Sequence, residues 1–263
     1  MNEKVYIDKF LDFRPQLKSF LFRILTNRQD CEDVLQETYL KFTQNLHSFR
    51  GESSFKTWVF TIAVNLARNH LKQQTRWGID YQDKGRDLHM ADQDYSDKMK
   101  HVFFADPDAN LEIQEHLDYC FTCISKTLEL TQQVCLFLKD VYGFKQKEIE
   151  DITGLSEGKV KHGITDARKN MMHIFDNRCA LINKQGVCDQ CTAIKGYLNP
   201  KQDAHALASQ LDLVKESDSA SRERLMDLRL EIVRSIDPIN KPSSQVHIYF
   251  LENLPQWAQI QSS

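Results

Sequence analysis

The side chains most able to do chemistry in this 263-residue chain are its cysteines. The stretch CALINKQGVCDQC, residues 179–191, holds three of the seven. Cys188 and Cys191 have the C-x-x-C spacing of half a tetrahedral zinc site, for which Cys179 and His173 are candidate third and fourth ligands. The spacing is not that of a complete finger, so a thiol switch and structural thiols stay open as alternatives. No Glu or His signature for a catalytic metal-bound water lies beside them, which argues against a zinc or thiol enzyme.

Other cysteines offer a second way to complete the zinc site. Cys188 and Cys191 would bind the metal with Cys120 and Cys123 if the C-terminal part folds back along the chain. Cys120, Cys123 and Cys135 lie among apolar neighbours, at spacings expected for the inner faces of helices. Such thiols more often act as small buried hydrophobic groups. Zinc is the only cofactor that the sequence suggests, and it is not required.

The composition of the chain limits the kinds of protein that it can be. The formal net charge is −3, with 41% hydrophobic and 27% charged residues, as in ordinary globular proteins. The start of the chain lacks the pattern of a signal peptide, and no apolar run reaches the roughly 18 residues of a membrane span. We therefore expect a cytoplasmic protein with reduced thiols that does not enter a membrane. Residues 50–76 carry a local charge of +4 and residues 80–118 one of −7, which predicts a phosphate-binding surface that the net charge conceals.

Hydrophobic periodicity is helical almost throughout, and no alternating run predicts a strand. The expected fold is all-α. We divide it into a helical domain at 1–76, an acidic flexible linker at 77–115, a second helical domain at 116–178, and a helical C-terminal extension at 179–263. In the extension, Asp218 or Ser219 is expected to cap a helix with Leu225, Leu228 and Ile232 inward and its arginines, Arg222, Arg229 and Arg234, elsewhere.

The first domain interleaves aromatic and basic residues. Asp30 is expected to cap one helix, and Ser53 or Ser54 the next. Phe55, Val59, Ile62 and Leu66 then form a buried stripe, while polar and basic residues share another face. Asn side chains hydrogen-bond base edges and Arg and Lys neutralise phosphates. Phe49, Phe55 and Trp58 are either core residues or platforms for unpaired bases.

The segment DCEDVLQETYLKFTQNLHSFRGESSFKTWVFTIAVNLARNHLKQQTR resembles region 2 of extracytoplasmic-function (ECF) sigma factors of bacterial RNA polymerase. The resemblance rests on the D-x-E-D-x-x-Q-E helix, the F-R-G-E-S-S-F loop and the T-W-x-x-x-I-A-x-N-x-A-x-N-x-L helix. It implies that the first helix binds the clamp helices of the largest polymerase subunit. The loop and the next helix would recognise and open the −10 element and hold a flipped non-template base.

The resemblance assigns roles residue by residue. Asp33, Gln36 and Glu37 would face polymerase. The −10 contacts would come from Ser48, Phe49, Arg50, Gly51, Glu52, Ser53, Ser54, Phe55, Lys56, Trp58, Asn65, Arg68, Asn69 and Lys72.

The second domain contains a helix-turn-helix pattern, FKQKEIEDITGLSEGKVKHGITDARKN. Gly154 suits a positive φ at the turn, and Val160, Ile164 and Ala167 would face inward on the second helix. This part resembles sigma region 4, which reads the −35 element and contacts the polymerase flap. The implied −35 contacts are Ser156, Glu157, Lys159, Lys161, His162, Thr165, Arg168 and Lys169. Gly163 and Asp166 occupy positions where family members often have Arg, which puts tight binding to the −35 element in doubt.

These features predict an ECF-type sigma factor that binds core RNA polymerase and melts promoter DNA without covalent chemistry of its own. An anti-sigma factor or a recruiting protein is a further candidate partner. The alternative is a helix-turn-helix regulator that is not a working sigma factor, controlled by a metal or thiol site.

Overall fold

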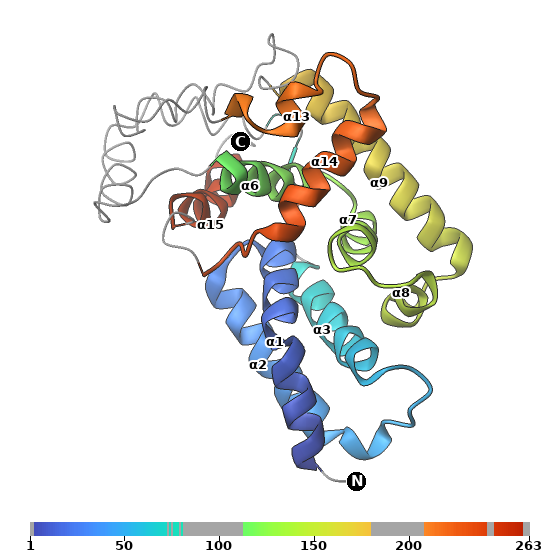
Figure 1. Cartoon of the computed structure of the whole chain (residues 1–263). Helices are drawn as coiled ribbons and strands as arrows, with labels where there is room; N and C mark the ends of the chain where they lie inside the picture. The colour runs from blue at the N-terminus through green and yellow to red at the C-terminus, as the bar shows by residue number, and fades with distance from the viewer. Residues whose placement is uncertain are drawn as a thin grey trace. The chain divides into compact units, whose positions relative to one another are not determined.

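The structure is a computed structural model that describes residues 3–72, 74, 76–78, 80, 113–179, 208–240 and 245–259, the last of these without the side chains of 246 and 254–259. In this part of the chain every regular element is a helix, as the sequence predicts (Figure 1). Contacts divide the chain into two compact units. Unit 1 comprises 1–76 and 128–167, and unit 2 comprises 77–127 and 168–263. The four-part division of the sequence stays a prediction, and most of its linker lies outside the described residues.

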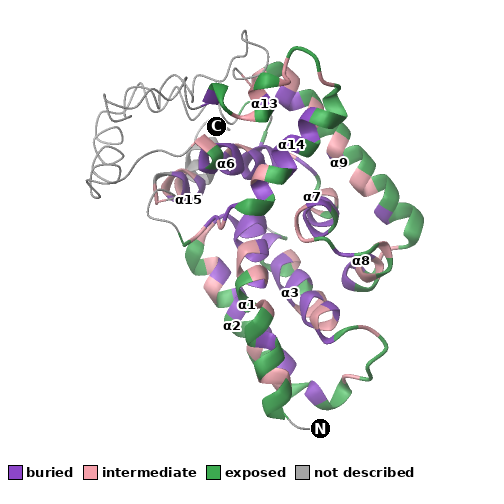
Figure 2. Ribbon diagram, viewed as in Figure 1, coloured by how far each residue is buried: buried purple, intermediate pink, exposed green. Residues whose placement is uncertain are grey.

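Three helices form the first part of unit 1, and all three pack on one another: α1 (Glu3–Leu25), α2 (Arg28–Gln44) and α3 (Phe55–Leu71). Figure 2 shows buried residues along their inner sides. Their core is aromatic: Phe10 and Phe42 lie 4.9 Å apart between ring centroids, and Phe20 and Phe60 lie 5.6 Å apart. Tilted ring pairs at such distances add to the stabilisation that burial of their area supplies.

In this unit, helices α2 and α3 begin where a side chain accepts a hydrogen bond from a backbone N–H of the first turn. The side chain of Asn27 caps α2 by accepting from the Asp30 backbone N at 3.0 Å. The prediction that Asp30 is the cap was wrong: Asp30 lies within the first turn of the helix, and its carboxylate pairs with His70 Nε2 at 3.0 Å. Ser54 caps α3, as predicted, and accepts from the Thr57 backbone N at 3.0 Å.

The second part of unit 1 carries the helix-turn-helix. It begins with α7 (Leu130–Leu136) and the five-residue π-helix η2 (Phe137–Val141). Helix α8 (Gln146–Thr153) ends at Gly154, whose φ of +70° confirms the predicted left-handed turn, and α9 (Glu157–Arg178) follows. Val160 and Ala167 are buried and Ile164 is half-buried, so the predicted inner side of α9 is confirmed.

Unit 2 is built around α6 (Ile113–Ser125) and α14 (Arg222–Ser235), which pack on each other. Their shared core contains Leu117, Leu225 and Leu228, with Leu213 from the short helix α13 (Asp212–Lys215). Helix α15 (Gln245–Gln259) also packs on α6, where the His247 ring stacks on that of Tyr119 at 4.9 Å.

Two expectations for the C-terminal extension were wrong. The N-cap of α14 is Ser221, which accepts from the Arg224 backbone N at 3.2 Å. Arg229 does not face solvent: it is only 3% exposed, and its guanidinium lies 4.1 Å from the centroid of the Phe175 ring. Its long stem and flat cation suit an aromatic face, so a charged residue occupies a core position here.

Candidate nucleic-acid interface

One face of α2 carries the residues expected to contact polymerase. Asp33, Gln36 and Glu37 are all exposed, whereas Val34 and Leu35 between them are buried. Leu40 continues this face one turn later and is 47% exposed. Sequence reasoning missed Leu40, because a leucine in an amphipathic helix is expected to lie in the core. The face therefore combines two carboxylates, an amide and an apolar side chain.

The loop between α2 and α3 presents two aromatic rings. It opens with the 3-10 turn η1 (Leu46–Ser48) and bends at Gly51, whose φ of +75° favours glycine. Phe49 and Trp58 are half-buried, with ring centroids 5.3 Å apart. Phe55 is 7% exposed and lies in the core. Phe55 thus supports the loop, and the accessible aromatic surface belongs to Phe49 and Trp58.

Tyr6 of α1 supports the same loop. Its ring meets Phe49 edge-on at 5.8 Å and Phe55 at 4.9 Å. No local motif could point to Tyr6, because it lies far from the loop in sequence. The remaining predicted residues of the loop surround these rings: Ser48, Arg50, Glu52 and Ser54 are exposed, and Ser53 is half-buried.

Along α3, the predicted DNA-contacting residues fall into two groups. Asn65, Asn69 and Lys72 are exposed and lie on one side of the helix at i, i+4 and i+7. Arg68 is half-buried, and its guanidinium donates to the carbonyl oxygen of Thr153 at the end of α8, at 3.0 Å. Burial lowers the pKa of Arg68.

Helix α8 and the turn before it cover more of α3. The Thr57 hydroxyl donates a hydrogen bond to a carboxylate oxygen of Glu148 at 3.3 Å. The Lys56 ammonium lies 4.8 Å from the centroid of the Phe144 ring, and its pKa is lowered because burial disfavours its charge. Two cations predicted to contact DNA, Lys56 and Arg68, are therefore engaged inside unit 1.

Helix α9 presents most of its predicted DNA contacts to solvent. Ser156, Glu157, Lys159, Lys161, His162, Thr165 and Lys169 are all exposed. Lys161 and Glu157 form an ion pair at 2.5 Å, which raises the pKa of Lys161 and lowers that of Glu157. Arg168 differs from these residues, because its guanidinium pairs with Asp227 of α14 at 2.5 Å.

The two departures from the family pattern lie in different surroundings. Asp166 is exposed beside the predicted DNA contacts. Gly163 is half-buried, and a Cβ there would lie 3.9 Å from Cys135 Sγ. An acidic side chain therefore remains among the cations of α9, whereas position 163 faces the helix packed beneath.

The described cysteines do not form a metal centre. Cys123 and Cys135 are buried, as predicted, and Cys120 is half-buried. Burial raises the pKa of Cys135 to about 11 and that of Cys31 to about 12, so both thiols are protonated at neutral pH. No group of three or more His, Cys, Asp or Glu side chains in the described ranges could hold a metal ion. His173 is exposed and Cys179 half-buried, while Cys188 and Cys191 lie outside the described residues.

Among the helices that could be searched, none is long and apolar enough to cross a membrane.

Comparison with known proteins gives two family matches in order along the chain. Residues 10–76 match sigma-70 region 2, and residues 120–171 match sigma-70 region 4. The first match contains α2, the aromatic loop and α3, and the second contains the helix-turn-helix. The order of the two matches is the order expected from the sequence motifs.

Individual relatives carry the same description. The ECF RNA polymerase sigma factor SigX of Bacillus subtilis is 30% identical over 169 residues, which cover 60% of this chain and 79% of the relative. The ECF RNA polymerase sigma-E factor of Haemophilus influenzae is 29% identical over 143 residues, covering 54% and 73%. A solved structure of the sigma factor RpoE with the anti-sigma factor NepR from Bartonella quintana aligns at 19% identity and a TM-score of 0.46, over 66% of this chain and 98% of that one. The SigX similarity, together with both region matches, shows that the chain belongs to the ECF family of RNA polymerase sigma factors.

Proposed function

We propose that this ECF sigma factor uses α3 and the loop before it to open the −10 element, and the N-terminal half of α9 to read the −35 element. The observation that carries the proposal is the arrangement on α3. Phe49 and Trp58 offer ring surface at the start of the helix, and Asn65, Asn69 and Lys72 continue from there on one exposed side. The bases and the backbone of one DNA strand could lie along this row of side chains. The chain would perform no covalent chemistry.

The physical requirements of melting match these residue types. Unstacking a base costs a few kcal/mol, which a melting protein offsets by stacking and hydrogen bonding the extruded base. Aromatic stacking contributes about 1–3 kcal/mol per base. Lys72 and Arg50, both exposed, would neutralise backbone phosphates, and the asparagine amides would hydrogen-bond base edges.

Promoter binding also requires α8 to leave α3. The −10 and −35 elements are centred about 25 base pairs apart, which is about 85 Å of B-DNA. In unit 1 the carbonyl of Thr153 accepts directly from Arg68. A chain with this contact cannot place α3 and the helix-turn-helix on both elements at once. We therefore propose that the promoter-bound chain is open and that Lys56 and Arg68 become available to DNA on opening.

The exposed face of α2 is the proposed polymerase contact. Asp33, Gln36 and Glu37 would meet basic and polar groups, and Leu40 would bury its exposed side chain against the clamp helices. A Glu37→Lys substitution reverses one charge of this face and should weaken binding to core polymerase by about tenfold, as expected for loss of a close charge pair.

Run-off transcription with core RNA polymerase tests the function. The wild-type holoenzyme should select genomic fragments and start transcription at defined positions. Asn65→Ala combined with Asn69→Ala should reduce open complexes while leaving polymerase binding unchanged. Asn177→Ala, which removes an exposed amide outside the proposed contacts, is the matched control. Promoter binding without defined transcription starts would instead support the helix-turn-helix regulator that is not a working sigma factor.

A further inference from the structure

We propose that α14 of the C-terminal extension is an electrostatic cover on the DNA-reading helix, in which Asp227 withholds Arg168 from the DNA backbone. The proposal deepens the proposed function and rests on it, because it concerns the −35 contact of α9. Neither the match to region 2 nor the match to region 4 includes α14, which begins well beyond residue 171.

Helix α14 packs firmly in unit 2. Its Leu225 and Leu228 are 5% and 3% exposed and share a core with Leu117 of α6. Met226, Leu230 and Val233 of α14 are buried as well. A helix that buries this much apolar surface is an integral part of unit 2.

Charged contacts fix α14 against the C-terminal half of α9. Arg222 pairs with Asp176 at 2.9 Å. The buried guanidinium of Arg229 lies over the ring of Phe175. Asp227 lies between these two anchors in sequence, and the position of its carboxylate beside Arg168 follows from a helix held at several points.

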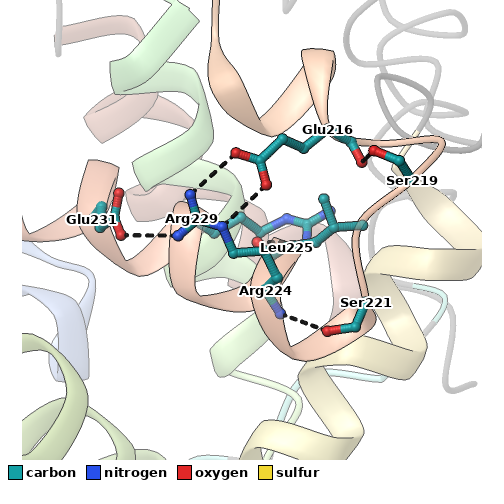
Figure 3. Close-up of polar contacts among 7 residues, drawn as sticks. All are labelled: Glu216, Ser219, Ser221, Arg224, Leu225, Arg229 and Glu231. Atoms are coloured by element: carbon teal, nitrogen blue, oxygen red, sulfur yellow. Dashed lines mark hydrogen bonds and ion pairs between the residues drawn. The ribbon is translucent and has the colours of Figure 1, made fainter.

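The turn before α14 is also held in place (Figure 3). Arg224 binds both carboxylate oxygens of Glu216, at 3.0 and 3.1 Å, and lies 3.5 Å from Glu231. These partners occupy the guanidinium of Arg224, so it does not neutralise Asp227. The exposed side of α14 therefore presents Glu223 and Asp227 one turn apart.

Arg168 belongs to the DNA side of α9. It follows Lys161 by seven residues and Thr165 by three, so the three side chains share one side of the helix. The Arg168 side chain is 25% exposed, while that of Asp227 is 52% exposed. An ion pair that solvent reaches in this way is weak and screened by salt. A DNA phosphate can therefore compete with Asp227, and the pair adjusts promoter affinity without abolishing it.

The cover has a measurable consequence for counterion release. Each phosphate contact contributes about 0.9 to the slope of log K against log salt concentration. Asp227 removes one such phosphate contact from the salt dependence, because Arg168 must give up the Asp227 carboxylate before it can bind a DNA phosphate. Removing the carboxylate should steepen the slope by about 0.9, which equals an about eightfold larger loss of affinity per tenfold rise in salt.

The test uses the full chain, in holoenzyme with core RNA polymerase, bound to a promoter fragment that the wild-type holoenzyme selects. Binding is measured over a range of salt concentrations. Asp227→Asn should tighten binding by about three- to tenfold at low salt and steepen the slope by about 0.9. Because Asp227 is exposed, the substitution leaves the core of unit 2 intact.

Two further variants decide the interpretation. Glu223→Gln makes the same change of charge one turn away, where it should change the slope by less than half as much. In an Arg168→Gln background, Asp227→Asn should have no effect, since the cation it frees is absent. An unchanged slope in Asp227→Asn, an equal effect of Glu223→Gln, or a persistent effect without Arg168 would each overturn the proposal. If the wild-type holoenzyme selects no promoter, the proposed function fails, and the cover fails with it.

Discussion

Phe49 and Trp58 are the single side chains on which the proposed melting step depends most directly. Their half-buried rings lie 5.3 Å apart beside the Gly51 turn. Trp58→Ala should reduce open-complex formation by about 5- to 150-fold, since a lost base stack costs about 1–3 kcal/mol. Permanganate footprinting of the −10 region measures this loss. Trp58→Phe keeps a ring and should retain most of the activity; equal losses in both variants would contradict a stacking role.

His247 should make the stability of the chain depend on pH. Burial and the neighbouring His116 lower the pKa of His247 well below 6.5. The unfolded chain therefore takes up a proton near pH 6.5 while the folded chain does not. The stability contributed by the neutral ring is complete above pH 6.5 and decreases as the pH falls below it, by up to about 1.4 kcal/mol per pH unit.

Urea denaturation of the full chain at pH 7.5, 6.5 and 5.5 measures this decrease. His247→Phe keeps the stack on Tyr119 and should flatten the dependence below pH 6.5. His173→Gln, a change at an exposed histidine, is the control. If the dependence is unchanged in His247→Phe, other groups cause it.

At the level of helices, the contact between α3 and α8 should separate when the chain binds polymerase. His70 of α3 and Lys147 of α8 are exposed, lie outside the proposed contacts, and suit spectroscopic labels attached through unnatural amino acids. The labels should lie close together in the free chain and tens of ångströms apart in the holoenzyme on promoter DNA. A pair of labels at Leu11 and Gln44, both exposed on the three-helix part of unit 1, should keep its distance. An unchanged distance between 70 and 147 would show that the closed contact persists on DNA.

Phe144 provides a second measure of the same contact. Its ring is 4% exposed and packs 4.7 Å from that of Phe60, between centroids. Phe144→Ala should destabilise the closed contact by about 3 kcal/mol, as for other large-to-small changes in cores. The distance between the labels in the free chain should then increase before any polymerase is added.

Local signals in the sequence were sufficient to predict an all-helical fold and some of its caps and turns. Ser54 and Gly154 act at their own positions, so a cap and a left-handed turn could be recognised from neighbouring residues. Asn27 was missed because two polar residues three positions apart fit the same capping rule, and Asp30 is one of them. Asp33, Gln36 and Glu37 of α2, which were expected to face polymerase, are exposed. Leu40 on the same face was missed because a leucine is expected to lie in the core.

Contacts distant in sequence could not be predicted in this way. The sequence gives no sign that Arg68 donates to Thr153, or that Arg229 lies over Phe175. In both cases a basic residue on an amphipathic helix would normally be expected in solvent, and only its partner from another element explains its burial. The pairing of Arg168 with Asp227 was unpredictable for the same reason, since it joins residues from two helices.

For the molecule as a whole, the C-terminal extension should be required for a correctly folded protein that does not aggregate. A chain ending at residue 178 would uncover Leu117 and Phe175, which α14 otherwise covers through Leu228 and Arg229. The truncated chain should bind a hydrophobic dye and aggregate, and its loss of activity would reflect misfolding. The full chain with Asp227→Asn, in contrast, should remain monodisperse. A soluble truncated chain that does not bind the dye would show that α14 is dispensable for folding.

The π-helix η2 constrains which changes of chain length this fold tolerates. Its wide turn is closed by the Tyr142 backbone N donating to the carbonyl of Phe137 at 2.9 Å, and it brings the Tyr142 hydroxyl to within 2.8 Å of the buried Arg23. Deleting one residue from 137–141 would restore α-helical bonding but rotate Tyr142 by about 100° around the axis. Arg23 would then lose its phenolic acceptor. A single-codon deletion in this segment should therefore be harmful, whereas a relative that lacks the residue should also lack the buried arginine.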